Sequence, residues 1–269
     1  MSKRPLKHRR ALITGASAGI GEALAREFAR HQFDLVLVAR REDRLLALAR
    51  ELSESHGIAV QTQVCDLQQP GAPAALFEAC EGLPIDVLVN NAGVMYHGDF
   101  KDQDAASIDA ILQLNIASLT HLTRLFLTPM QEQDSGRILN ITSTTGFKAG
   151  PTIAVYAASK AYILSFTEAL AEELRGTGVS ATALCPGSTD TAMVSTSFGE
   201  KLRSDMAGSL LMMSTAEVAR HGYRACMAGT TVSVPGLANK VINACVSLQP
   251  RWLSRRLQSY LYRKLLDRQ

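Results

Sequence analysis

The stretch Ala11–Gly21, ALITGASAGIG, decides the fold of this chain. It begins with a short apolar run typical of a buried strand, and then places three glycines directly before an amphipathic helical pattern. Such glycines allow a tight turn and let a pyrophosphate approach the helix N-terminus, where free N–H groups favour negative charge. A glycine-rich loop without a ligand is the alternative. The context of strand, glycines and helix favours a phosphate-binding turn, with ligand residues Gly15, Ser17, Ala18, Gly19, Ile20 and Gly21.

The same alternation of apolar runs and helical patterns continues along the chain. Strands are expected at 11–16, 34–40, 59–67, 85–93, 136–144 and 179–187, with an edge strand at 230–236. Helices are expected at 21–31, 41–56, 72–82, 104–130, 154–178 and 214–229. Near-continuous apolar strands joined by helices predict one doubly wound α/β domain over residues 1–269. Its parallel sheet of about seven strands is flanked by helices on both faces, and ligands lie beyond the carboxyl ends of the strands.

Composition excludes several classes of protein. The 269 residues carry a net charge of only +3, which is too small to indicate a nucleic-acid partner. No apolar run approaches the roughly 18 residues of a membrane span, and the basic N-terminus lacks a signal-peptide core. The five cysteines lack metal-ligand spacing, so no metal site is predicted. Cys65, Cys185 and Cys245 lie in apolar stretches, which indicates buried free thiols and a cytoplasmic protein.

The end of the second predicted strand indicates which nicotinamide cofactor fits. An acidic residue there would bind a ribose 2′-hydroxyl, whereas arginine accommodates a 2′-phosphate. The sequence has Arg40 and Arg41 with no acid before them, and Ser17 could add a hydroxyl donor. The alternative is an arginine-rich surface paired with Glu42 and Asp43. Because arginine binds phosphate through charge-assisted bonds, the prediction is NADP(H).

Residues at the next two strand ends complete the predicted cofactor site. Asp66 and Leu67 follow the third strand, where an adenine edge would lie. The fourth strand ends in NNAG, whose Asn91, Ala92 and Gly93 are small enough to let the cofactor lie close. None of these residues is distinctive alone, but their position at successive strand ends supports a role in binding the cofactor.

Tyr156 and Lys160 lie one helical turn apart, on the same face of a predicted helix. A free phenol has a pKa near 10, too high for efficient proton exchange near neutrality. A nearby ammonium favours the phenolate and lowers that pKa. Ser143 ends the fifth predicted strand, where its hydroxyl could donate to a substrate carbonyl. Alone, these residues would be ordinary packing and surface groups.

Together with the glycine turn, these motifs resemble those of the short-chain dehydrogenase/reductase family. TGASAGIG, NNAG, Asn115, Ser143, YAASK at 156–160 and the Pro186–Gly187 pair occur in the family's order over roughly Arg10 to Thr191. The resemblance implies a Rossmann-type NADP(H) oxidoreductase that forms a homodimer or homotetramer. It implies that Tyr156 is the catalytic acid and that Lys160 tunes it and binds the nicotinamide ribose. Ser143 would bind the substrate carbonyl, and the backbone of Asn115 would hold a water that links Lys160 to solvent. Ser188, Thr189 and Thr191 are expected to contact the nicotinamide carboxamide, and Pro186 and Gly187 before them are expected to bind the cofactor.

Residues 192–213 form the predicted substrate lid, because this segment sets specificity in the family and is rich in Met, Leu, Val and Phe. These side chains could instead pack on the body. If they line the pocket, the substrate is a hydrophobic acyl, steroid-like or aromatic ketone. A sugar or polyol is the alternative substrate, and an NADP(H)-binding sensor or scaffold without turnover is the alternative function.

Residues 250–269 predict a basic amphipathic helix, with leucines at 253, 257, 261 and 265. Such a helix can lie on an anionic membrane surface. It can equally dock on its own domain or on a partner subunit.

Overall fold

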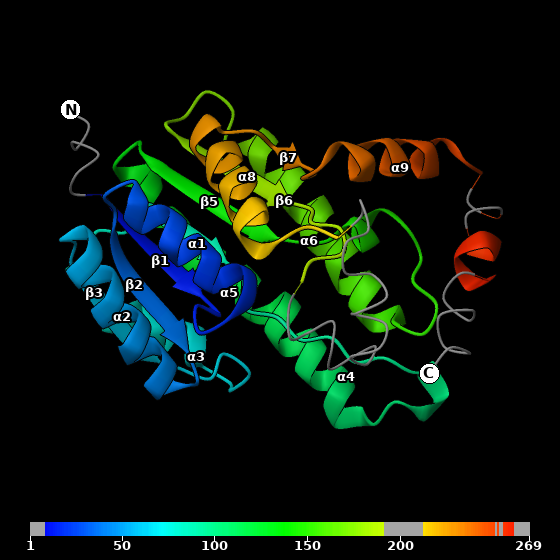
Figure 1. Cartoon of the computed structure of the whole chain (residues 1–269), viewed down its shortest axis with the longest axis horizontal. Coiled ribbons are helices and arrows are strands. Elements are labelled where there is room, and N and C mark those ends of the chain that lie inside the picture. The colour runs from blue at the N-terminus through cyan, green and yellow to red at the C-terminus, as the bar shows by residue number, and fades with distance from the viewer. Residues whose placement is uncertain (1–8, 191–211, 251, 253–254, 261–269) are drawn as a thin grey trace.

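A parallel seven-stranded sheet forms the centre of the protein (Figure 1). The structure, a computed structural model, describes residues 9–190, 212–250, 252 and 255–260. The strands are β1 (Arg10–Thr14), β2 (Asp34–Ala39), β3 (Val60–Val64), β4 (Val87–Asn90), β5 (Gly136–Ile141), β6 (Val179–Leu184) and β7 (Val232–Ser233). Their order is β3-β2-β1-β4-β5-β6-β7, so β1 pairs with both β2 and β4. The order reverses at β1, and such a switch point opens a ligand crevice beyond the strands' carboxyl ends.

Helices cover both faces of the sheet, as predicted. Helices α1, α2 and α8 pack together over one face, and α3, α5 and α6 cover the other (Figure 1). The helices are α1 (Gly19–Arg30), α2 (Glu42–His56), α3 (Ala72–Ala79), α4 (Ala105–Ile111), α5 (Leu119–Glu132), α6 (Ala154–Glu173), α8 (Thr215–Ala228) and α9 (Leu237–Leu248). Short helical segments are η2 (Phe100–Asp102), η3 (Leu112–Ser118) and η4 (Thr144–Phe147). The predicted doubly wound, Rossmann-type α/β fold is confirmed.

Alternating strand residues feed two apolar cores, one on each face of the sheet. Leu12 of β1 packs toward α3, α5 and α6, whereas Ala11 and Ile13 pack toward α1, α2 and α8. All three side chains are fully buried. Successive side chains of a strand point to opposite faces, so a strand buried on both sides has no polar alternation. This explains the near-continuous apolar runs of the sequence.

Helix ends follow local sequence signals. Helix α2 stops at Gly57, which takes the left-handed φ of +65° that glycine adopts without a Cβ clash. Helix α8 starts with the predicted capping box, in which Ser214 and Glu217 each accept a bond from the other's backbone N–H. These two signals fix the boundaries of helices that pack on the same face of the sheet.

The long helix expected over 104–130 is confirmed as a continuous helical run over 105–132, but it contains an unpredicted π-helical segment: α4 leads into η3 and then into α5. Pro129 lies in the last turn of α5, and its carbonyl accepts a bond from the Gln133 N–H.

The expectation of three buried cysteines was wrong in part. Cys185 is buried and Cys65 is half-buried, but Cys245 is exposed on α9.

The C-terminal part of the chain is described in pieces. Trp252 and residues 255–260 are helical, and the rest of the predicted basic helix lies outside the described residues except for 250. The predicted lid lies outside them too, apart from Met212 and Met213. No helix in the described ranges combines the length and apolar character needed to cross a bilayer.

Candidate active site

A cavity of about 660 Å³ lies beyond the carboxyl ends of the central strands. Its walls come from the turns after β1, β2, β3, β4, β5 and β6 and from the first turns of α6. Of the predicted site residues, the cavity is lined by Gly15, Ser17, Ala18, Gly19, Ile20, Arg40, Arg41, Asp66, Leu67, Asn91, Ala92, Gly93, Ser143, Tyr156, Lys160, Pro186, Gly187 and Thr189. Gly21 and Asn115 lie behind the wall, and Thr191 lies outside the described residues. The volume falls within the roughly 300–1,000 Å³ of small-molecule and cofactor sites.

A specific structural constraint requires glycine at each of three positions in the first turn. Gly15 and Gly19 have φ values of +66° and +60°, a backbone conformation that favours glycine. Gly21 lies in α1 so close to the turn that a Cβ there would come within 2.3 Å of the Gly15 carbonyl oxygen. The three glycines bring the chain back on itself, with the N-terminus of α1 at the cavity. Ala18 caps α1 without a side-chain hydrogen bond, so the first N–H groups of the helix are not capped by its side chain.

The turns after β1 and β4 are joined by side-chain hydrogen bonds. The Thr14 hydroxyl oxygen accepts from the backbone N–H groups of Asn91 (2.9 Å) and Ala92 (3.0 Å). The Asn91 amide donates to the Thr14 carbonyl oxygen at 2.8 Å. These bonds hold the glycine turn against the NNAG turn. The switch point is therefore rigid.

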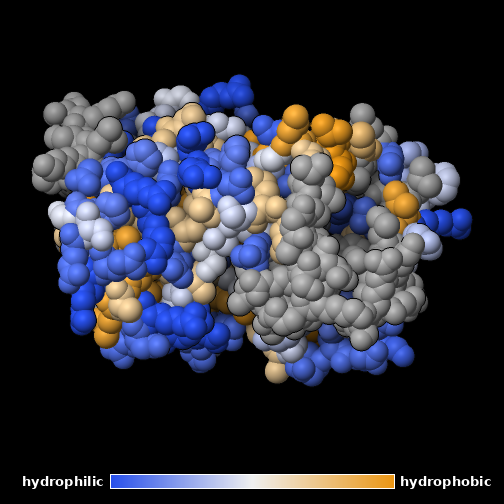
Figure 2. Space-filling view, viewed as in Figure 1, coloured by the Kyte–Doolittle hydropathy of each residue, from blue (hydrophilic) through white to orange (hydrophobic). Residues whose placement is uncertain are grey.

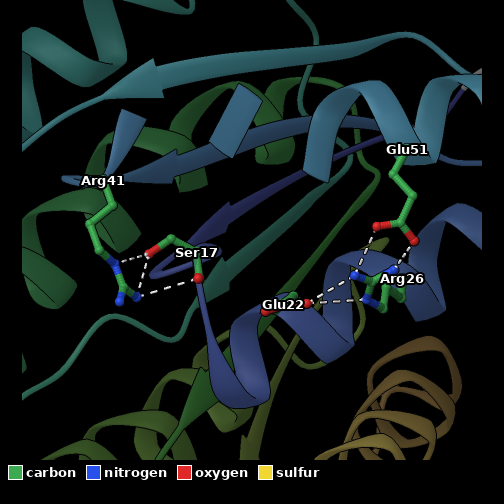
Figure 3. A network of polar contacts seen from close by, with 5 residues as sticks. All are labelled: Ser17, Glu22, Arg26, Arg41 and Glu51. Carbon is green, nitrogen blue, oxygen red and sulfur yellow. Dashed lines mark hydrogen bonds and ion pairs between the residues drawn. The ribbon is translucent and has the colours of Figure 1, made fainter. Parts of the chain in front are cut away.

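Arg41 reaches back to the glycine turn (Figure 3). Its guanidinium donates to the Ser17 hydroxyl oxygen at 2.9 and 3.2 Å and to the Ser17 carbonyl oxygen at 3.3 Å. Arg40 is exposed, and its guanidinium lies 4.0 Å from the Asp66 carboxylate. The cavity thus has two guanidinium groups beside the end of β2, where an adenosine ribose would lie.

A second arginine in Figure 3 fixes α1 against α2. Arg26 of α1 donates to Glu22 in the same helix at 2.9 Å and to Glu51 of α2. The hydrogen bond from Arg26 lowers the pKa of the half-exposed Glu51 carboxyl. Because Ser17 precedes α1 and Arg41 precedes α2, this link helps to hold the glycine turn and the arginine-bearing turn in register.

Ser143, Tyr156 and Lys160 converge on the cavity from β5 and α6. Ser143 follows β5, and its hydroxyl accepts from the Thr145 N–H at 3.2 Å. Tyr156 is 9% exposed, and the Lys160 ammonium lies 5.6 Å from the centroid of its ring. The spacing predicted from the sequence thus brings hydroxyl, phenol and ammonium to one wall.

The ammonium of Lys160 is buried and donates to the Ile141 carbonyl oxygen at 2.9 Å. Burial lowers its pKa from 10.5 to about 8, because a charged group loses water contacts there. The backbone of Lys160 is also tightly packed, because a Cβ on Gly146 would come within 2.8 Å of the Lys160 carbonyl oxygen. The Thr142 hydroxyl donates to that same carbonyl at 2.8 Å.

Asn115 supports the wall from behind. Its amide oxygen accepts from the Val94 N–H at 2.9 Å, and its amide nitrogen donates to the Val94 carbonyl (3.0 Å) and to the Ser159 hydroxyl (3.1 Å). The side chain is fully engaged, so only its backbone remains for the water expected from the family resemblance. Asn115 lies in the π-helical η3, and such wider turns occur often at functional sites.

Sequence reasoning missed several residues of the substrate end of the cavity. Met95, Thr145, Lys148 and Ile153 all line it. Met95 packs against the small core that contains Tyr156 and Ile153. The available signal was their position, because all four lie in turns that follow strand ends or precede α6.

The described residues on the two sides of 191–211 lie next to each other. Thr189 and Met213 form a parallel bridge, with the Asp190 N–H donating to the Met213 carbonyl and the Met213 N–H donating to the Ser188 carbonyl. Asn239 of α9 packs on the same turn, since a Cβ on Gly187 would lie 2.5 Å from its amide oxygen. Helix α9 is therefore in contact with the wall of the cavity.

Comparison with known proteins identifies the family. The sequence model described as short chain dehydrogenase matches residues 9–201, which covers every strand from β1 to β6. The chain belongs to the short-chain dehydrogenase family. Members of this family bind NAD(P)(H), and two of the solved relatives contain NADPH or NADP.

Three relatives of this short-chain dehydrogenase are informative. The ketoacyl reductase HetN of Nostoc sp. is 38% identical over 178 residues, which are 65% of this chain and 62% of HetN. A solved 7beta-hydroxysteroid dehydrogenase has a TM-score of 0.84 at 26% identity and covers 93% of this chain and 96% of its own. A short-chain dehydrogenase from Sphingobium yanoikuyae in complex with NADPH has a TM-score of 0.79 at 30% identity, covering 90% and 97%.

Proposed function

We propose that this protein is an NADP(H)-dependent oxidoreductase that transfers hydride between the nicotinamide and the carbonyl or hydroxyl carbon of a hydrophobic substrate. One observation carries the proposal: Ser143, Tyr156 and Lys160 line the same cavity as the glycine turn and Arg41. A dinucleotide on the turn would extend along the strand ends toward these three side chains. The physiological direction is reduction, since cellular NADPH pools drive it.

The cavity fits the cofactor by its shape and by its donors. The glycine turn leaves room for backbone to approach a pyrophosphate, and the N-terminus of α1 favours its negative charge. Bound cofactor supplies the hydride. Gly187 and Thr189 would contact the nicotinamide, because they lie after β6 in the same wall.

The protein's own residues would handle the proton and the carbonyl oxygen. Ser143 donates a hydrogen bond to the substrate oxygen, and Tyr156 gives its phenolic proton to that oxygen as hydride reaches the carbon. The ammonium of Lys160 favours the phenolate that remains. Its side chain is held by the bond to Ile141, so its position beside Tyr156 does not depend on the substrate. Asn115 would support proton return through a water on its backbone.

Two features support NADP(H) over NAD(H). Arg41 is already oriented by Ser17, and Arg40 lies beside it at the end of β2. The only acidic residue of β2 is Asp34, which begins the strand, so no carboxylate lies at its carboxyl end to bind a ribose 2′-hydroxyl instead. Charge-assisted bonds from two guanidinium groups favour a 2′-phosphate.

A hydrophobic substrate fits the described part of the cavity. Val94, Met95 and Ile153 surround Tyr156 at the catalytic end. The apolar composition of residues 192–213 adds to this argument from the sequence, and we propose that they act as a lid. A sugar or polyol would require more polar groups at this end.

The test is an oxidation screen in which NADPH and NADH are offered with ketones graded in hydrophobicity. We expect NADPH to be preferred, and we expect ketones with an apolar body to be reduced faster than sugars or polyols. Preference for NADH would overturn the cofactor assignment, and activity confined to sugars would overturn the substrate class. A sensor without turnover would bind NADPH and reduce none of the ketones.

We also propose that the chain forms a homo-oligomer in the cytoplasm and that its C-terminal segment can contact an anionic membrane. Residues 237–269 carry seven basic side chains and one acidic side chain, although the whole chain has a net charge of only +3. Leu237, Val241 and Ile242 of α9 are exposed, and Figure 2 shows an apolar patch over this helix. An exposed apolar face beside basic residues is typical of helices that lie on membrane surfaces.

A further inference from the structure

The charges of the cavity do not balance, and one basic side chain has no role in the proposed function. Among the described residues that line the wall, four are cations, namely Arg40, Arg41, Lys148 and Lys160, and Asp66 is the single carboxylate. Arg40 and Arg41 lie at the adenosine end. Lys160 belongs to the catalytic group. Lys148 remains unassigned.

Lys148 lies at the catalytic end of the cavity. It follows η4, five residues after Ser143, and its backbone N–H donates to the Thr145 carbonyl. Its neighbour Phe147 packs into a small core with Leu164 and Cys185, which anchors the turn to α6 and β6. The position of Lys148 is therefore fixed by packing, and it is separated from the glycine turn by β4 and β5.

The ammonium of Lys148 has lost water contacts without gaining a partner among the residues that the structure describes. The residue is half-buried, and no ion pair or side-chain hydrogen bond of Lys148 is found within the described ranges. Burial lowers its pKa, and no neighbouring carboxylate opposes this effect. A cation that is partly desolvated and unpaired costs free energy in the empty protein, and an anion would remove that cost.

We propose that Lys148 binds an anionic group carried by the substrate, such as a carboxylate, at the far end of an apolar body whose carbonyl lies at Ser143 and Tyr156. This inference rests on the proposed function and narrows its substrate class from hydrophobic ketones to amphipathic keto acids. The apolar side chains of Met95 and Ile153 line the same cavity and pack in the small core that contains Tyr156. A charge-assisted bond in a partly dry site is stronger than one in water, so Lys148 acts as a specificity residue.

The test uses matched ketones with NADPH and the full chain. Each ketone carries an apolar chain that ends in a carboxylate, its methyl ester or a trimethylammonium group, and the chain is lengthened one methylene at a time. At the best length, we expect kcat/KM for the carboxylate to exceed that for the ester by about tenfold, with the cation lowest. Lys148→Met should reduce the ratio of carboxylate to ester to near one, and Lys148→Arg should largely retain it.

Lys101→Met is the matched control, because Lys101 is exposed and lies outside the cavity wall. A wild-type ratio near one at every length overturns the inference, as does an unchanged ratio in Lys148→Met. Equal losses on carboxylate and ester also overturn it, since they indicate that Lys148 pairs with another part of the chain. If no ketone is reduced, the proposed function fails. In that case, calorimetry measures the affinity of the wild type and of Lys148→Met for the same carboxylates, and we expect weaker binding by the variant.

Discussion

The guanidinium of Arg41 donates to the hydroxyl oxygen of Ser17 at 2.9 Å, across the turns that follow β1 and β2. A 2′-phosphate beside this pair would therefore meet groups that are already oriented. We expect Arg41→Ala to raise KM for NADPH about ten- to hundredfold, the range for losing one or two charge-assisted bonds. KM for NADH should change little, since it has no 2′-phosphate. Initial rates with both cofactors check this, and equal losses with both would contradict the assignment.

Tyr156→Phe tests the proton donor. The change removes one hydroxyl group from a nearly buried ring and leaves its packing against Ile153 intact. Turnover should fall by about a hundredfold or more, the contribution typical of general acid catalysis. NADPH affinity, measured by fluorescence titration, should stay close to that of the wild type. Retained turnover would mean that another group supplies the proton.

Lys160 should make the stability of the protein depend on pH. Its folded pKa of about 8 lies below the usual 10.5, so between these values the unfolded chain binds a proton that the folded protein does not. Stability from this group therefore rises as pH increases from about 8 to about 10.5 and is lowest below pH 8. Urea unfolding of wild type and Lys160→Met at pH 7 and pH 10 isolates the effect. The variant should gain less stability than the wild type over this interval; identical pH dependence in the two proteins contradicts the prediction.

Gly21→Ala should damage the first turn. The new Cβ would lie 2.3 Å from the Gly15 carbonyl oxygen and 2.4 Å from the Asn91 amide nitrogen, so the backbone must move. We expect a lower Tm and a large loss of NADPH affinity. Gly82→Ala is the control, because its Cβ meets nothing within 4 Å and only the φ of +75° adds strain, which costs about 1 kcal/mol. It should lower Tm without affecting cofactor binding.

The exposed face of α9 predicts binding to anionic vesicles. Co-sedimentation with phosphatidylserine-containing vesicles should exceed that with neutral vesicles and should weaken as salt is added. Replacing Val241 and Ile242 by serine should reduce binding, because it removes the exposed apolar contacts. Equal binding to both vesicle types would exclude an electrostatic contribution. A change of oligomeric state in the double variant, without any change in vesicle binding, would instead make this face a subunit contact.

The sequence was most informative where local chemistry and position coincide. The glycine turn, the capping box of α8 and the pair Tyr156 and Lys160 each depend on spacing along one element, which the sequence displays directly. The family resemblance then covered β1 to β6, which the family match over residues 9–201 confirmed.

Other features depend on contacts between distant elements and could not be predicted. The π-helical η3 has the same apolar pattern as an α-helix, so the periodicity gave no sign of it. The bonds from Asn115 to Val94 and Ser159 join three elements. The role of Lys148 in lining the cavity depends on where η4 lies beside α6, and Cys245 is exposed because α9 leaves one face uncovered.

The bridge between Thr189 and Met213 brings the described residues on the two sides of 191–211 together at one point of the protein. We therefore expect that the sequence between these two residues can be exchanged without altering the path of β6 or α8. Ser143 follows β5, and Tyr156 and Lys160 lie on α6, so the residues proposed for the reaction lie outside the segment between Thr189 and Met213. Segments exchanged between relatives at these two residues should therefore transfer substrate preference as a unit, while the reaction itself stays the same.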